Sequence, residues 1–124
     1  MKPLLTENLT AGAAIAPYRI CKAGAADLTA IQAAASTAGM FGVSDSLGAA
    51  AANDRVDIYT AGVVDVEYGG AVTRDDLLTA DADGKAVAAA PAAGVNARII
   101  GIARVSGVLG DIGLVQLAPG RIQG

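Results

Sequence analysis

Apolar and charged residues alternate with a period of two along the middle of the chain. Val56 and Ile58 alternate with Arg55 and Asp57, and the segment 64–68 alternates in the same way. Successive side chains of a strand point to opposite faces of its sheet, so this pattern predicts antiparallel strands with one exposed face. The 16 glycines divide the chain into short pieces, which is typical of small barrels and sandwiches. We therefore predict a mainly β, single-domain fold of short antiparallel strands, either barrel-like or sandwich-like.

The segment 68–87, YGGAVTRDDLLTADADGKAV, has the order strand, turn, strand. Asp83 and Gly84 offer the two positive-φ positions that a two-residue hairpin turn requires. Leu77, Leu78 and Val87 give the two arms of this hairpin apolar side chains to bury. The segment therefore indicates structure and surface rather than chemistry.

A pattern of four short apolar runs occurs twice. Gly42 and Gly101 lie 59 positions apart, and each begins a short run that is followed by a loop and a longer run. The runs of the first half are 19–22, 29–33, 42–44 and 54–62, and those of the second half are 77–79, 85–88, 101–103 and 111–120. The pattern predicts an internal duplication of four strands. Chance likeness between segments rich in Ala and Gly is the alternative.

Two alanine-rich segments are ambiguous between helix and extended structure. In residues 25–38, Asp27 is a suitable helix cap and alanine favours a helix, whereas the repeat requires a strand at 29–33. We favour the strand. Residues 49–52 are compatible with one helical turn inside a loop.

The first 14 residues contain scattered leucines but no sustained period. They are predicted to form an extended N-terminal arm, which leaves residues 15–124 as one β-rich domain. The segment is interrupted by Pro3 and Glu7, so it is expected to be neither a signal peptide nor a membrane span.

Composition narrows the partners that the chain could have. Only 3% of the 124 residues are aromatic, so large anchors for a self-contained core are scarce and contacts with partners are expected to add stability. The net charge is −3 and the basic residues are scattered singly, which argues against nucleic-acid binding. The single Cys21 is expected to be a small buried apolar group. We expect a soluble protein that is made in a reducing cytoplasm.

Catalytic chemistry is poorly supported by the sequence. The chain has no His, which excludes a Ser-His-Asp triad and a His-ligated metal site. Asp75 with Asp76, and Asp81 with Asp83, are paired acids, yet no aromatic wall accompanies them as a sugar-cleaving site would need. Residues 81–84 also lack the later ligands of a calcium loop. Aspartates that form turns are the preferred interpretation, with no cofactor and no metal.

Several segments occur in an order that is similar to one known family. These are 16–20, 41–45, 55–58, 62–74, 76–87, 101–103 and 110–112. In this order the chain resembles the capsid decoration, or cement, proteins of tailed bacteriophages, and the likeness extends over nearly the whole chain. The family pattern has Gly where this chain has Asp75, a residue that tolerates a left-handed backbone better than most.

The resemblance implies a non-enzymatic virion protein on the outer surface of an icosahedral head. It implies binding to the major capsid protein, assembly as homotrimers and stabilisation of the shell, with the N-terminal arm as the contact. The residues expected in this capsid-binding arm are Lys2, Pro3, Leu4, Leu5, Thr6 and Leu9, and those of the family-motif turn are Gly69, Gly70, Asp76, Asp83 and Gly84. The alternatives are another virion structural protein, which forms shell or tail, and a hydrolase that depends on Asp76 or Asp83.

Overall fold

The computed structural model describes residues 2–124, which form one nine-stranded sheet and no helix. The strands are β1 (Lys2–Ala11), β2 (Ile20–Ala23), β3 (Thr29–Gln32), β4 (Met40–Ser44), β5 (Arg55–Glu67), β6 (Leu77–Ala80), β7 (Ala86–Ala88), β8 (Asn96–Ala103) and β9 (Ile112–Gln123). The prediction of a mainly β fold is confirmed. Among the described residues, no helix is long and apolar enough to cross a membrane.

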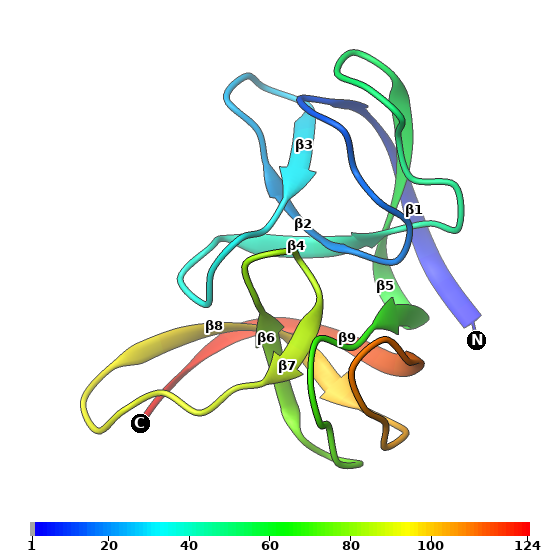
Figure 1. Cartoon of the computed structure of the whole chain (residues 1–124). Helices are drawn as coiled ribbons and strands as arrows, with labels where there is room; N and C mark the ends of the chain where they lie inside the picture. The colour runs from blue at the N-terminus through cyan, green and yellow to red at the C-terminus, as the bar shows by residue number, and fades with distance from the viewer. Residues whose placement is uncertain (1) are drawn as a thin grey trace.

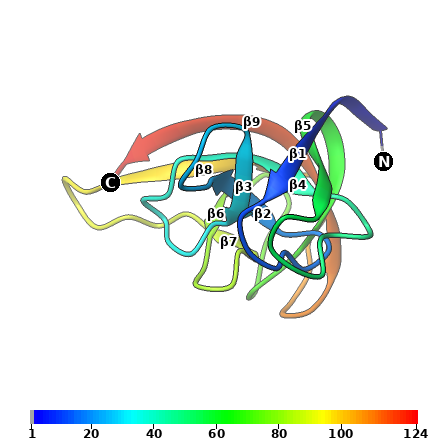
Figure 2. The ribbon, with the colours of Figure 1, turned by 90° about the horizontal axis from the view of Figure 1, so that it is seen from above.

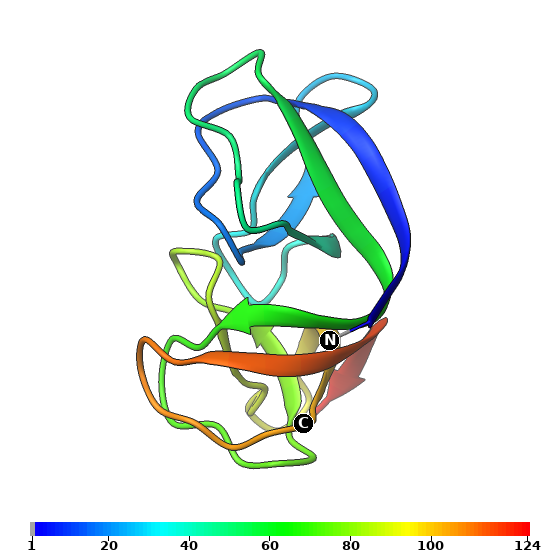
Figure 3. The same ribbon diagram turned by 90° about the vertical axis from the view of Figure 1, so that its right-hand side faces the viewer.

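The sheet folds into two lobes that share one long strand (Figures 1 and 3). The strand order is β1-β3-β2-β4-β5-β9-β8-β6-β7, and an additional pairing of β1 with β5 closes a ring of five strands. We call residues 2–61 the first lobe and residues 62–124 the second lobe. In the second lobe, a bridge between Tyr68 and Ala86 brings β7 back to the end of β5, so this lobe also curls around its own core.

The predicted repeat is present as a repeated topology. The antiparallel pairs β2–β3, β2–β4 and β4–β5 recur as β6–β7, β6–β8 and β8–β9. Loop hydrogen bonds recur as well: the amide of Ala11 donates to the carbonyl of Asp54 at 2.8 Å, and that of Tyr68 donates to the carbonyl of Asp111 at 2.8 Å. Both residues of the second bond lie 57 positions after those of the first. The halves therefore have the same fold, with all eight predicted strands in place.

The alternating runs 54–62 and 64–68 join into one strand, β5, of 13 residues. Gly62 lies at the junction with φ +103°. A β-carbon at this position would collide with the carbonyl of Lys2 in β1. Glycine is thus required here both for its backbone conformation and for the close approach of β1.

Neither alanine-rich segment is helical. Residues 29–32 form β3, which pairs with β2 and, through Thr29 and Ala30, with the end of β1. Ala30 is fully buried in this position, so tertiary pairing outweighs the helix preference of alanine. Residues 49–52 are a bend that is anchored by the bridge between Ile15 and Ala49.

The hairpin of β6 and β7 forms as predicted, but its turn is one residue longer. Asp81 and Lys85 are joined by a backbone hydrogen bond of 2.9 Å and enclose a loop of three residues, 82–84. Of these only Gly84 has a positive φ, +75°. The carboxylate of Asp81 accepts the amides of Asp83 and Lys85 at 2.8 and 2.9 Å. Because a side chain satisfies the turn amides, the two-residue turn is not needed, and a glycine-ended loop of three forms instead.

The buried residues form two clusters. The smaller one fills the first lobe and includes Ile15, Cys21, Val56 and Ile58. The larger one fills the second lobe and continues into the contact between the lobes; its largest fully buried side chain is Tyr68. The hydroxyl of Tyr68 donates to the carbonyl of Val105 at 2.7 Å, so its buried polar atom is satisfied.

The ring of Tyr68 packs directly on glycines of β9 and the preceding loop. A β-carbon on Gly113 would overlap the phenol, and one on Gly107 would come within 2.8 Å of the ring. These positions therefore have room for glycine alone, and the aromatic ring takes the space of the missing side chains.

We predict that Gly113→Ala lowers the free energy of unfolding by about 1–3 kcal/mol, because overpacking forces the Tyr68 ring to move. Gly39→Ala is the control, since a β-carbon there meets nothing within 4 Å and the residue has no positive φ. Urea denaturation of the two variants gives the comparison. Equal stabilities would contradict the packing role of Gly113.

Candidate functional site

The predicted N-terminal arm runs as an extended strand along β5. From Lys2 opposite Val63 to Thr10 opposite Arg55, β1 is antiparallel to β5. Arg55 fastens this pairing, because its guanidinium donates to the side chains of Asn8 and Thr10 at 2.8 Å each. The other edge of β1 meets β3 only at Thr10 and Ala11. Among the described residues, the edge from Lys2 to Leu9 therefore has no partner strand.

Two leucines of this strand point into solvent. Pairing shifts from Pro3 with Gly62 to Leu5 with Ala61, so Leu4 is an extra residue and forms a bulge. A bulge interrupts the alternation of faces. Leu4 and Leu5 are 74% and 56% exposed, and residues 6–8 that follow are exposed as well.

The remaining predicted arm residues differ in burial. Lys2 and Thr6 are exposed, Pro3 is half-buried, and Leu9 is half-buried against the smaller core. This part of β1 lies at the periphery of the molecule (Figures 2 and 3). The strand thus presents an open backbone edge together with an apolar pair of side chains.

The tip of the family-motif turn contacts the first lobe. The carbonyl of Asp83 accepts from the guanidinium of Arg19 at 2.9 Å and from the side-chain amide of Gln32 at 3.0 Å. The carbonyl of Gly84 accepts the amide of Ile20 at 2.8 Å. These bonds join the β6–β7 loop to β2 and β3, so this turn is a connection between the lobes.

Charged side chains reinforce this connection. Glu67, at the end of β5, accepts from Arg19 at 3.3 Å and from Lys85 at 3.2 Å. The three side chains are only 16–22% exposed, so their interaction is less screened than that of a surface pair. The sequence did not indicate the contact of Arg19 with Glu67, because the two residues lie 48 positions apart and no local pattern relates them.

The other family-motif residues also support local structure. A β-carbon on Gly69 would collide with the carboxylate of Asp81, whereas one on Gly70 would make only an ordinary contact with Val87 at 3.9 Å. The carboxylate of Asp76 accepts the amide of Thr73 at 2.9 Å and closes its own turn. Gly69 and Asp76 thus brace the hairpin and the loop before it.

The same carboxylate-closed turn occurs at three places within residues 2–124. Asp54 accepts the amide of Ala51 at 3.1 Å, and Asp111 accepts that of Val108 at 2.9 Å, as Asp76 does with Thr73. The residue before each aspartate has a positive φ: Asn53 at 72°, Asp75 at 75° and Gly110 at 89°. Asp75 therefore adopts the left-handed conformation that the family glycine would supply. The sequence had favoured turn formation for Asp76 and Asp81, and both carboxylates accept turn amides; Asp54 and Asp111 were not predicted.

Cys21 is fully buried in the smaller core. Burial raises the pKa of its thiol from the ordinary 9.0 to about 12, so the thiol stays protonated and is inert at neutral pH. Within residues 2–124, no group of three or more Cys, Asp or Glu side chains is arranged to hold a metal ion.

Comparison with known families assigns this chain to a family. Residues 2–110 match the model of the phage cement protein family. The chain belongs to the phage cement protein family. Cement proteins are structural components of phage heads, so the chain is a capsid-associated structural protein. The resemblance noted in the sequence is confirmed.

A solved structure shows the same fold as this cement protein. The crystal structure of the head fiber gp8.5 N base in bacteriophage phi29 aligns with a TM-score of 0.71 and 18% identity, covering 97% of this chain and 98% of that chain. At this identity the likeness establishes the fold alone. No curated protein matches the chain.

We predict that Glu67→Gln destabilises the cement protein by about 1–3 kcal/mol, because it leaves Arg19 and Lys85 close together without their shared carboxylate. Glu7→Gln is the matched control, since Glu7 is exposed and is expected to change stability by less than about 0.5 kcal/mol. Thermal and urea denaturation measure both. A cost no larger for Glu67 than for Glu7 would show that the charged connection contributes nothing.

We also predict a loss of stability above pH 9 that originates at Cys21. Because the folded pKa is raised to about 12 from 9.0, the unfolded chain loses its thiol proton first and stability falls as pH rises between these values. From pH 8 to pH 10 the free energy of unfolding should fall about 1 kcal/mol more in the native protein than in Cys21→Ala. Parallel pH dependences would rule this out.

Proposed function

We propose that this chain decorates the outer surface of an icosahedral phage head, where it binds the major capsid protein and stabilises the shell. Family membership supports a structural role in the head, and β1 supports the mode of attachment. An edge strand with free backbone donors and acceptors can add itself to, or accept, a strand of another protein. Leu4 and Leu5 would then give the contact its apolar anchors.

We propose further that it acts as a homotrimer with β1 as the capsid-binding arm. A single edge of about eight residues offers a small interface, and small interfaces bind weakly. Three linked copies convert the second and third contacts into local events and so raise the overall affinity without new kinds of contact. A closed threefold ring meets this need. In this proposal residues 1–14 serve the capsid and residues 15–124 form the decorating body.

The second candidate is another structural element of the virion, such as the base of a fiber. The fold shared with the phi29 head fiber base favours it. A decorating protein and a fiber base both bind the head, but a shell-forming or tail protein assembles on its own. Light scattering of the purified chain, with and without undecorated heads, separates a head-binding protein from a shell-forming or tail protein, because a head-binding protein increases scattering only when heads are present.

The arm is best tested with exposed side chains, because deletion of residues 2–9 would also remove the strand pairing of β5. We predict that Leu4→Ser with Leu5→Ser leaves the melting temperature nearly unchanged and weakens head binding by about tenfold or more, since each lost apolar contact is worth about 1 kcal/mol. Binding is measured by co-sedimentation with undecorated heads.

The matched control is Leu47→Ser with Leu109→Ser, in which two loop leucines that are 82% and 66% exposed are changed in the same way. It should bind as the native protein does. If both double variants bind equally well, β1 is not the contact. If the native chain itself fails to bind heads, decoration is wrong.

A further inference from the structure

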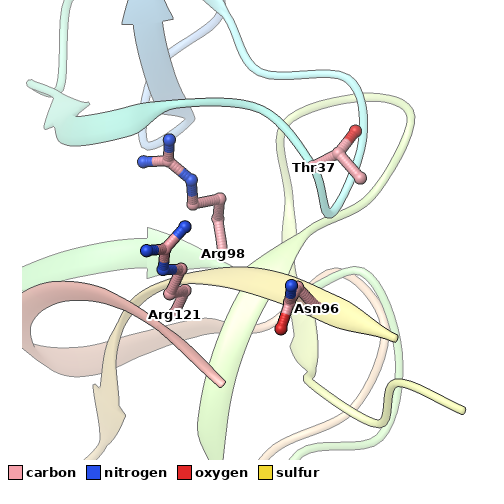
Figure 4. Close-up of a pocket in the computed structure, with 5 residues that line it drawn as sticks. Thr37, Asn96, Arg98 and Arg121 are labelled. Carbon is pink, nitrogen blue, oxygen red and sulfur yellow. The ribbon is translucent and has the colours of Figure 1, made fainter. Parts of the chain in front are cut away.

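Arg98 and Arg121 lie directly opposite one another on neighbouring strands. They are Cα partners in the antiparallel pair of β8 and β9, and both are exposed. Their guanidinium groups extend toward the same side of the sheet (Figure 4). Like charges at directly opposed positions destabilise a strand pair. The arrangement therefore lowers the stability of the isolated chain, and a role in binding would explain it.

The two guanidinium groups are not neutralised within residues 2–124. The ion pairs of this part of the chain join Arg19 and Lys85 to Glu67. The side chains of Arg55 and Arg104 are hydrogen-bonded to neighbouring polar groups. Neither Arg98 nor Arg121 has a side-chain hydrogen bond or a carboxylate within salt-bridge distance among the described residues. The pair is therefore free to bind an external anion.

The surroundings give these groups a defined place. Arg98 and Arg121 line an open recess of about 110 Å³ together with Thr37, Asn96 and Ala97, and a recess of roughly 10–15 Å³ already admits one water molecule. The amide of Arg98 donates to the carbonyl of Ser36 at 2.7 Å, which holds the loop of Thr37 against β8. Ala97 also lines a larger groove of about 390 Å³ between residues 35–36 and the β6–β7 hairpin, so the two hollows have a lining residue in common.

We propose that Arg98 and Arg121 together bind a carboxylate of a neighbouring protein subunit. Arginine presents planar, forked donors that suit a carboxylate, and two of them can hold both of its oxygens. A nucleic-acid backbone would need a wider basic surface, whereas the chain has net charge −3. The carboxylate belongs either to a second copy of this chain or to the shell. The second case rests on the proposed decoration of heads.

The site is tested first without any partner, with succinate as the probe. We expect the side-chain Nε–H signals of Arg98 and Arg121 to shift together in nitrogen–proton spectra as succinate is added. Arg98→Gln with Arg121→Gln should abolish this response in the backbone signals of Asn96 and Ala97. Arg74→Gln with Arg104→Gln, which removes two other exposed arginines, should keep it.

Melting temperatures separate this role from a structural one. Without added carboxylate, Arg98→Gln should raise the melting temperature by about 1–4 °C because it removes the repulsion. A structural arginine would give a decrease.

Two further measurements on the variant Arg98→Gln with Arg121→Gln identify the source of the carboxylate. Loss of self-association in sedimentation, relative to the Arg74 and Arg104 control, assigns it to a second copy. Unchanged self-association with about tenfold weaker binding to undecorated heads assigns it to the shell. The proposal is overturned if succinate moves neither arginine signal and both measurements equal the control. Failure of the native protein to bind heads would refute decoration alone, because the succinate response needs no head.

Discussion

The fold depends on β5 being continuous through both lobes. Its first part pairs with β1 and β4, and its second part pairs with β9. Val56 and Ile58 enter the smaller core, whereas Val64 and Val66 enter the larger one. One strand thus carries residues of two cores, and Gly62 with φ +103° lets it pass from one to the other. Without that glycine, the approach of β1 and the course of β5 would conflict.

A continuous strand alone would leave a hinge between the lobes, and the β6–β7 turn removes it. The turn carbonyls bind Arg19, Gln32 and Ile20 of the first lobe, and Glu67 holds Arg19 and Lys85 together. Because Ile20, Met40 and Val43 also pack in the larger core, polar and apolar contacts fix the same geometry. The family-motif turn therefore acts together with the apolar core to hold the two similar halves in one arrangement.

The local sequence pattern predicted the strands whose formation depends on neighbouring residues. The alternation at 55–58 and 64–68, the repeat of four runs and the strand at 29–33 were all recoverable, because side-chain period and glycine spacing act over a few residues. The left-handed Asp75 was inferred from resemblance and residue type. The length of the β6–β7 turn was not, because it depends on the carboxylate of Asp81. The contacts of Arg19 with Glu67 and the register that opposes Arg98 to Arg121 join distant segments, and no local period encodes them.

The exposed edge of β1 is a disadvantage for an isolated monomer. An unpaired edge invites aggregation, and proteins usually protect such edges with charge, proline or a bulge. Lys2, Pro3 and the bulge at Leu4 are protections of this kind, yet Leu4 and Leu5 remain exposed beside them. These features hinder unspecific strand pairing but leave two apolar side chains accessible. This combination is what the proposed arm needs to bind one partner selectively. The opposed arginines are likewise unfavourable in the isolated chain, and the proposed binding of a carboxylate would remove their repulsion in a complex.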